Sequence, residues 1–349
     1  MDSCLPAGAV EASLWREWRG GPDVHCILCA HYCRIAPGER GRCGVRENQD
    51  GVLYTLVYGR PVSLAVDPIE KKPLFHFLPG SLSLSLATVG CNFTCSFCQN
   101  SDISQMPHDR GRITGRSVSP GQVVEAALEA GCLSISYTYT EPTVFYEYAR
   151  DCARLASAAG LKNVFVTNGY MTAQALRDID GLLHAVNVDL KSFSDDFYRA
   201  QAGARLKPVL DSIRRLWDMG VWMEVTTLLI PGLNDGEGEL RSLAAFLASI
   251  SSDIPWHVSR FHPSYHLLDV GATPVDSIER AVAIGREEGL VYVYGGNIPG
   301  HSSESTFCPA CGAVVIERQG FSLRRMMLTD GRCSGCGREI AVMQREERK

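Results

Sequence analysis

Residues 82–296 alternate short apolar runs with longer segments in which apolar residues recur at intervals of three and four. The apolar runs are LSLSLATV (82–89), SISYTYT (134–140), NVFVT (163–167), AVNVDL (185–190), WMEVTTLLI (222–230) and WHVSRF (256–261), followed by VYVYG (291–295). The helix-like segments between them include residues 121–131, 143–160, 206–220 and 277–289. Strands that alternate with helices of this length pair in parallel through right-handed crossovers. The chain is therefore predicted to be an α/β protein built on six βα units, a partial (β/α)6 TIM-like barrel.

This pattern divides the 349 residues into three parts. We expect a cysteine-rich metal-binding module at residues 1–80, the partial barrel at 81–300, and a zinc-ribbon-like or rubredoxin-like module at 301–349. The composition, 45% hydrophobic and 21% charged residues, is that of an ordinary folded protein.

Charge and hydropathy exclude several classes of partner. The formal net charge is −5 and the isoelectric point is about 6.0, so no basic surface for nucleic acid is indicated. No stretch approaches the roughly 20 apolar residues needed to span a bilayer. The first residues, MDSCLPAGAVEASLWREW, lack the cationic and apolar regions of a secretory signal. We expect a cytoplasmic protein without membrane or nucleic-acid partners.

Disulfides are rare in a reducing compartment, so the cysteines of a cytoplasmic protein need another explanation. Of fourteen cysteines, eleven form three sets: Cys26, Cys29, Cys33 and Cys43; Cys91, Cys95 and Cys98; and Cys308, Cys311, Cys333 and Cys336. The remaining Cys4, Cys132 and Cys152 stand alone, and we expect a terminal thiol and two small apolar core residues.

The middle set, in GCNFTCSFCQN, has three cysteines and no fourth nearby. Thiolates are soft ligands for zinc or iron–sulfur clusters, and structural zinc prefers four protein ligands. Three thiolates on a four-iron cluster would leave one iron open to a small molecule. A zinc knuckle that borrows a distant ligand is the alternative.

Polar side chains follow the predicted strands at the edge where this cysteine loop begins. They are Thr140-Glu141, Thr167-Asn168, Asp189 with Lys191, Thr226 to Pro231, and Arg260 to His262. One such residue is usually a turn or cap residue. Five of them beside a metal loop favour a shared site, because the carboxyl ends of barrel strands carry the chemistry.

The middle cysteine motif resembles the signature of radical S-adenosylmethionine (SAM) enzymes, C-x3-C-x-φ-C, with Phe97 as the aromatic residue. The resemblance implies a [4Fe-4S] cluster on Cys91, Cys95 and Cys98. Its open iron would bind SAM, and reductive cleavage would give a 5′-deoxyadenosyl radical that abstracts a hydrogen atom from a substrate.

The same resemblance implies SAM contacts at the strand ends. YTYTEP resembles the family's GGE element, with Thr140 beside Glu141, which is expected to hold the SAM ammonium; Tyr139 and Thr140 replace the common glycines. Asn168 resembles a ribose or carboxylate contact. Asp189 and Lys191 resemble SAM-contacting positions of glycyl-radical activating enzymes. His262 is a catalytic candidate whose role is open.

The flanks resemble those of AmmeMemoRadiSam system radical SAM enzymes, a branch similar to pyruvate formate-lyase activating enzyme. The resembling segments are CILCAHYCRIAPGERGRCGVREN and YGGNIPGHSSESTFCPACGAVVIERQGF. This resemblance implies Memo-like and AMMECR-like partners, together with a reductant protein such as a flavodoxin or ferredoxin. The substrate is not implied. Activation of a partner protein through a glycyl radical is the alternative function, and a non-catalytic metal-binding scaffold is the third.

The flanking cysteine sets each supply four ligands. Paired C-x2-C knuckles at Cys308, Cys311, Cys333 and Cys336 predict structural zinc, with rubredoxin-like iron as the alternative. The spacing of Cys26, Cys29, Cys33 and Cys43 is compatible with zinc or with a second iron–sulfur cluster, and a regulatory disulfide is a more distant alternative.

Overall fold

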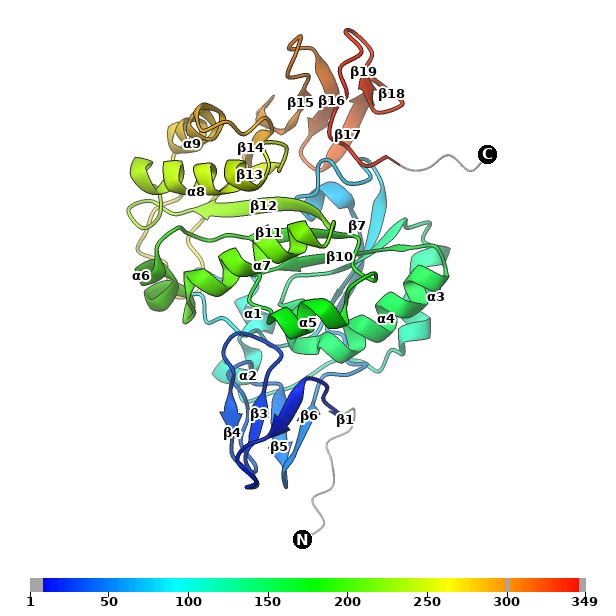
Figure 1. Cartoon of the computed structure of the whole chain (residues 1–349), viewed down its shortest axis with the longest axis vertical. Helices are drawn as coiled ribbons and strands as arrows, with labels where there is room; N and C mark the ends of the chain where they lie inside the picture. Colours follow the sequence, from blue (N-terminus) through cyan, green and yellow to red (C-terminus); the bar gives the residue numbers. More distant parts are fainter. Residues whose placement is uncertain (1–8, 299–301, 345–349) are drawn as a thin grey trace.

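A computed structural model describes residues 9–298 and 302–344. Its centre is an eight-stranded sheet in which seven consecutive strands, β8 to β14, run parallel and β7 lies antiparallel at one edge (Figure 1). In sheet order the strands are β14 (Val293–Gly296), β13 (Trp256–Arg260), β12 (Trp222–Leu229), β11 (Ala185–Asp189), β10 (Lys162–Thr167), β9 (Ser134–Tyr137), β8 (Leu82–Ala87) and β7 (Ser63–Pro68). The predicted α/β class and parallel pairing are confirmed.

Two details of the sheet differ from the sequence prediction. β9 ends at Tyr137, three residues before the predicted end, because the backbone turns at Tyr139, whose φ is 65°. β7 falls within the segment expected to form only the cysteine-rich module, yet it pairs with β8 from Ser63↔Ala87 to Pro68↔Leu82. The sheet thus has an antiparallel edge strand that the prediction missed.

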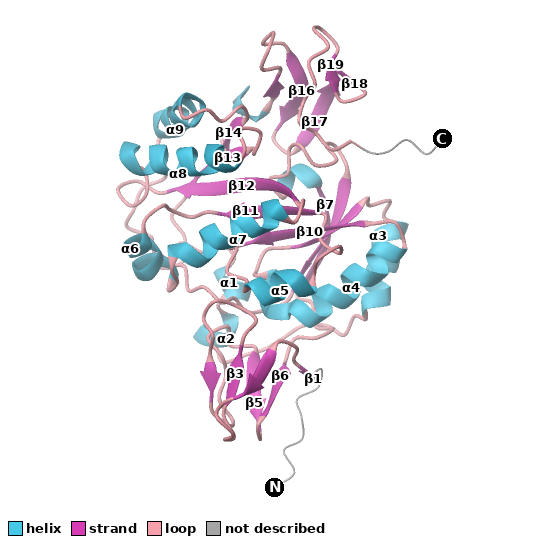
Figure 2. Ribbon diagram, in the orientation of Figure 1, coloured by secondary structure: helices cyan, strands magenta, loops and turns pink. Residues whose placement is uncertain are grey.

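Helices pack against the parallel strands and bury their apolar faces. α4 packs on β9 and β10, α7 on β12, and α9 on β13 and β14 (Figure 2). Ser119 begins α3 with a capping box to Gln122, which satisfies free N–H groups at the helix start. The helices are α1 (Ser101–Ser104), α2 (Met106–Asp109), α3 (Pro120–Glu129), α4 (Tyr146–Ala158), α5 (Ala173–Asp178), α6 (Asp195–Phe197), α7 (Leu206–Asp218), α8 (Glu237–Ile250) and α9 (Val275–Glu287). No helix in the described part of the chain is long and apolar enough to cross a membrane.

Two small antiparallel sheets form the N-terminal module, at the bottom of Figure 1. Their orders are β1 (Val10–Glu11), β6 (Val52–Thr55), β5 (Arg46–Gln49), and β2 (Trp15–Glu17), β3 (Val24–Cys26), β4 (Arg34–Ile35). Arg46 is 2% exposed and forms an ion pair of 2.9 Å with Glu147 of α4. This buried pair fastens the module to the main domain.

The C-terminal module lies at the opposite end of the molecule (Figure 1) and has its own small core. It consists of the sheet β15 (Thr306–Phe307), β16 (Val314–Gln319), β17 (Ser322–Met326) and the ribbon β18 (Leu328–Thr329), β19 (Arg332–Cys333). Its Val315 and Ile316 pack in one cluster with Phe75, Tyr292 and Tyr294 of the main domain.

Residues 70–78 connect the sheet with this module. The buried Glu224 carboxylate of β12 accepts hydrogen bonds of 2.8 Å from both Phe75 N and His76 N. On the other side, His76 Nδ1 contacts Ala341 O at 2.5 Å, and Arg318 Nη2 donates to Phe75 O. The segment is therefore held from both sides by buried polar groups.

Candidate functional site

A cavity of about 300 Å³ opens at the carboxyl ends of the parallel strands. All the residues predicted to bind the central cluster and SAM line it, namely Cys91, Cys95, Cys98, Thr140, Glu141, Asn168, Asp189 and Lys191. Phe97 of the cysteine motif lines it as well, as do Thr226 of β12 and Ser259 of β13. The topology thus collects on one rim residues that are up to about half the chain apart.

His262 does not join this group. It follows β13, is exposed, and is not among the residues that line the cavity. Its candidate role has no geometric support from this cavity.

The cysteine loop is held by backbone contacts on both sides. Thr94 N donates to Ala202 O at 3.0 Å, and Ser96 N donates to Gln201 O at 2.9 Å, both in the π-helical turn η3 (Tyr198–Ala202). Gly90 has a φ of 99°, and a Cβ there would lie 2.7 Å from Val45 Cγ1. A glycine is therefore required where the loop after β8 packs against the N-terminal module.

Cys95 of this loop is buried, Cys91 and Cys98 are half-buried, and the three sulfurs do not all lie within 4.8 Å of one another. Burial and the nearby Glu141 raise the pKa of Cys91, and burial raises the pKa of Cys95 to about 12, with Lys191 opposing. Metal binding would therefore have to release thiol protons. Within residues 9–298 and 302–344, the cysteines whose ligand atoms all come within 4.8 Å of one another belong to the C-terminal set. The wider arrangement of Cys91, Cys95 and Cys98 fits a cluster of several irons.

Glu141 is buried and organises the neighbouring strand end. Its carboxylate accepts hydrogen bonds from Thr143 N at 3.0 Å, Thr167 Oγ1 at 2.8 Å and Asn168 N at 2.8 Å. Burial raises the pKa of Glu141, and these hydrogen bonds oppose the rise. Oε2 accepts only the Asn168 bond among the described residues, so it keeps a lone pair for a ligand donor.

Tyr139 takes the left-handed backbone conformation that glycine would favour, and a buried network supports it. Its hydroxyl donates to Asp67 Oδ2, and Lys72 Nζ lies 4.4 Å from its ring centroid. Lys72 and Asp67 form an ion pair of 2.8 Å. Asp67 and Lys72 were not predicted from the sequence, because they belong to β7 and the turn after it. Tyr139 O accepts from Asn100 Nδ2 at 2.9 Å, which links this turn to the cysteine loop.

Three further groups give the cavity its polarity. Lys191 Nζ lies 3.1 Å from Asp189 Oδ2; burial alone would lower the pKa of Lys191, but Asp189 raises it above its usual value. Asn168 Nδ2 donates to Asn92 Oδ1 at 2.7 Å beside Cys91. Thr226 Oγ1 is buried without a hydrogen-bond partner in the described residues, and it would be satisfied by a ligand.

The four C-terminal cysteines converge. Cys308 and Cys336 have sulfurs 3.5 Å apart, and those of Cys311 and Cys333 are 3.7 Å apart. These distances are too long for disulfide bonds of about 2.05 Å. They match the edge of a tetrahedron around an ion bound at about 2.3 Å, which is about 3.8 Å. A single tetrahedral ion such as zinc fits this set.

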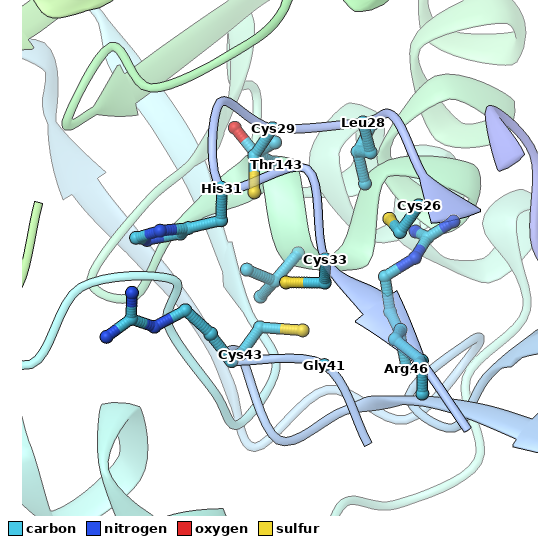
Figure 3. A pocket seen from close by; sticks show the side chains of 12 residues that line it. Cys26, Leu28, Cys29, His31, Cys33, Gly41, Cys43, Arg46 and Thr143 are labelled. Atoms are coloured by element: carbon cyan, nitrogen blue, oxygen red, sulfur yellow. The ribbon is translucent and has the colours of Figure 1, made fainter. Parts of the chain in front are cut away.

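The four N-terminal cysteines line a small cavity of about 20 Å³ (Figure 3). Cys26 ends β3, Cys33 precedes β4, and Cys26 N donates to Cys33 O at 2.9 Å. Leu28, Ile35 and Arg46 complete much of the lining. The lone Cys132 and Cys152 are buried as expected, whereas Cys4 lies outside the described residues.

Comparisons with known proteins agree with this geometry. Residues 85–244 match the sequence profile of the Radical SAM superfamily. An uncharacterised protein of Methanocaldococcus jannaschii is 45% identical over 323 residues, which cover 92% of this chain and 96% of that protein. The pyruvate formate-lyase-activating enzyme of Clostridium pasteurianum is 21% identical over 203 residues, covering 52% of this chain and 81% of the enzyme.

A solved structure extends the comparison to the fold. SuiB of Streptococcus suis, bound to S-adenosylmethionine, matches with a TM-score of 0.50 and 12% identity. The match covers 69% of this chain and 56% of SuiB. At this identity the likeness concerns the fold.

Proposed function

This chain belongs to the radical SAM superfamily, and we propose that it binds a [4Fe-4S] cluster on Cys91, Cys95 and Cys98 and cleaves S-adenosylmethionine reductively. The observation that carries the proposal is a set of three thiols, one buried and two half-buried, that line a cavity together with ionisable groups. When bound, the cluster and SAM supply a 5′-deoxyadenosyl radical that abstracts a hydrogen atom from a substrate.

The residues of the cavity orient the cofactor in this proposal. The free lone pair of Glu141 accepts from the SAM ammonium, and Asn168 offers its amide beside Cys91. Asp189 and Lys191 present opposite charges to the hydroxyl and carboxylate groups of the ligand. Thr140 acts through the backbone, because its Oγ1 already donates to Thr88 O at 3.0 Å. Burial of these groups strengthens each polar contact.

Three accompanying assignments belong to the same proposal. The C-terminal cysteines hold structural zinc, on the strength of their tetrahedral spacing. A reductant protein of the flavodoxin or ferredoxin class supplies the electron. Association with Memo-like and AMMECR-like proteins in the cytoplasm, and the partial-barrel description of the fold, rest on the sequence motifs.

The test is anaerobic reconstitution with iron and sulfide, reduction by dithionite and addition of SAM. We expect 5′-deoxyadenosine and methionine from the wild-type chain and their loss in Cys95→Ala. Cys132→Ala, a buried cysteine outside the cavity, is the matched control and retains the activity. If the wild-type protein, loaded with its cluster, released no 5′-deoxyadenosine, the proposal would be refuted.

Activation of a partner protein is the second candidate, favoured by the similarity to pyruvate formate-lyase-activating enzyme. Electron paramagnetic resonance of candidate partners after the reaction would detect a glycyl radical. A carbon-centred radical on a partner assigns this function, and deoxyadenosine without any protein radical favours a small-molecule substrate. Retained cellular function after Cys95→Ala would instead favour the non-catalytic scaffold.

A further inference from the structure

The N-terminal cysteines have no role in the function proposed above. We propose that Cys26, Cys29, Cys33 and Cys43 hold a second iron–sulfur cluster, which passes electrons to the central cavity. The relay rests on the proposed function, whereas the cluster assignment stands independently of it.

Thiol spacing separates the N-terminal set from a zinc site. Four thiolates on one zinc ion lie about 3.8 Å apart, because each Zn–S bond is about 2.3 Å. The C-terminal cysteines meet this condition, and across the described ranges they form the group whose ligand atoms all lie within 4.8 Å. In the N-terminal set, as in Cys91, Cys95 and Cys98, no three sulfurs all lie within 4.8 Å of one another. A core of several irons fills a larger space between its thiolates than one ion does.

The lining of the N-terminal cavity suits an anionic cluster. Leu28, Ile35 and Val144 make its walls apolar, and Cys26 and Cys43 are buried. Arg46 lines the same cavity with its guanidinium beside Cys26 (Figure 3).

One nitrogen of this arginine is left for a ligand. Arg46 donates through Nη1 and Nη2 to Glu147, but its buried Nε has no hydrogen-bond partner among the described residues. A thiolate or sulfide of a cluster would accept from that N–H. Hydrogen bonds to cluster sulfur are one of the means by which a protein sets a reduction potential.

The N-terminal set shares a wall with the central cavity. His31, two residues after Cys29, contacts Asn92 O at 2.7 Å through Nε2, and Asn92 directly follows Cys91. Near the other end of the set, a Cβ on Gly90 would lie 3.0 Å from Cys43 O. One hydrogen bond and one close backbone approach therefore join the segments that carry the two sets of thiols.

A positively charged surface adjoins this wall. His31 and Tyr170 line a cavity of about 380 Å³ together with Arg42, Arg199 and Arg205. All three arginines are exposed; Arg199 pairs with Asp195 at 2.7 Å, and Arg42 and Arg205 supply the positive charge that an acidic one-electron carrier complements. In the proposed order of electron transfer, the carrier loses one electron to the N-terminal cluster, which passes it to the central cluster. The electron then reduces SAM at its C5′–S bond, and cleavage of that bond gives methionine and the 5′-deoxyadenosyl radical.

The first experiment identifies the metal without using activity. The full chain with Cys91, Cys95 and Cys98 all changed to Ala is reconstituted anaerobically with iron, sulfide and zinc together. We expect about half of the wild-type iron and sulfide to remain, with the Mössbauer signature of an iron–sulfur cluster. Zinc without sulfide at the N-terminal set would overturn the assignment. Electron paramagnetic resonance of the reduced wild-type protein should likewise show two distinct cluster signals, which would support the assignment without any variant.

The second experiment tests the relay. Deoxyadenosine formation is driven by dithionite or by reduced flavodoxin, and the ratio of the two rates is compared between variants. Cys29→Ser with Cys33→Ser should lower the flavodoxin-to-dithionite ratio several-fold, while Cys152→Ala, a buried cysteine of α4, leaves it unchanged. An unchanged ratio in the double variant refutes the relay. Absence of deoxyadenosine from the wild type with either reductant refutes the proposed function and leaves the cluster assignment in place.

Discussion

Tyr139 provides a sharp test of the backbone geometry at the rim of the cavity. Its φ of 65° is a left-handed conformation that costs a non-glycine residue about 1–2 kcal/mol. Tyr139→Gly and Tyr139→Ala both remove the phenol that contacts Asp67 and Lys72, so that loss cancels between them. Glycine relieves the backbone cost and alanine does not. The glycine variant should therefore unfold with a free energy about 1 kcal/mol higher than the alanine variant.

The assay is urea unfolding of the metal-free chain, followed by circular dichroism. The matched control is Ala126→Gly in α3, where the helical backbone favours alanine and glycine lowers the free energy of unfolding by about 1 kcal/mol. The order of glycine and alanine is thus expected to reverse between the two positions. An alanine variant at residue 139 as stable as the glycine variant would refute the reasoning. It would mean that the turn linked to Asn100 relaxes without strain.

Three other outcomes are expected. Glu224→Ala leaves two backbone N–H groups and His257 without their buried acceptor and should lower the free energy of unfolding by about 3–5 kcal/mol. As a control, Glu237→Ala at an exposed glutamate should lower it by less than about 1 kcal/mol in the same urea titration. Burial lowers the pKa of His76 from 6.5 to about 4, so the unfolded chain takes up this proton first as the pH falls. About 3 kcal/mol of stability should be lost between pH 6.5 and pH 4, and a flat profile in wild type, or the same slope in His76→Phe, would contradict this. Cys311→Ser should lose its zinc to a chelator that leaves about one zinc per chain in wild type, as atomic absorption would measure; equal retention in both proteins would argue against the four-cysteine site.

The sequence was most informative where local pattern and topology agree. The parallel strands were predictable because each is a continuous apolar run between helix-like segments. The cavity residues were predictable because they follow those strands, so the topology alone brings Glu141, Asn168 and Asp189 to one rim.

The missed features depend on contacts between distant parts of the chain. β7 lacks the alternation of a half-buried strand: its first three residues are half-buried, Val66 is exposed and only Asp67 is buried. Its place in the sheet follows from pairing with β8 and from Asp67, which bonds to Tyr139, 72 residues later. Likewise, spacing alone left the metal of the N-terminal cysteines undecided, because the relevant quantity is the separation of sulfurs in the folded chain.

The contacts of residues 70–78 also have a consequence for biosynthesis. The side chains of Glu70 and Arg318 are both fully buried, and Arg318 Nε lies 3.8 Å from Glu70 Oε1. Arg318 also donates to Phe75 O. Arg318 follows β14, the last strand of the central sheet to be translated, by 22 residues. Until Arg318 is translated, Glu70 and the carbonyl of Phe75 lack this cation, and Tyr292 and Tyr294 lack their apolar cover. The nascent sheet should therefore remain open at this edge, a natural site for chaperone binding, until the last module has been translated.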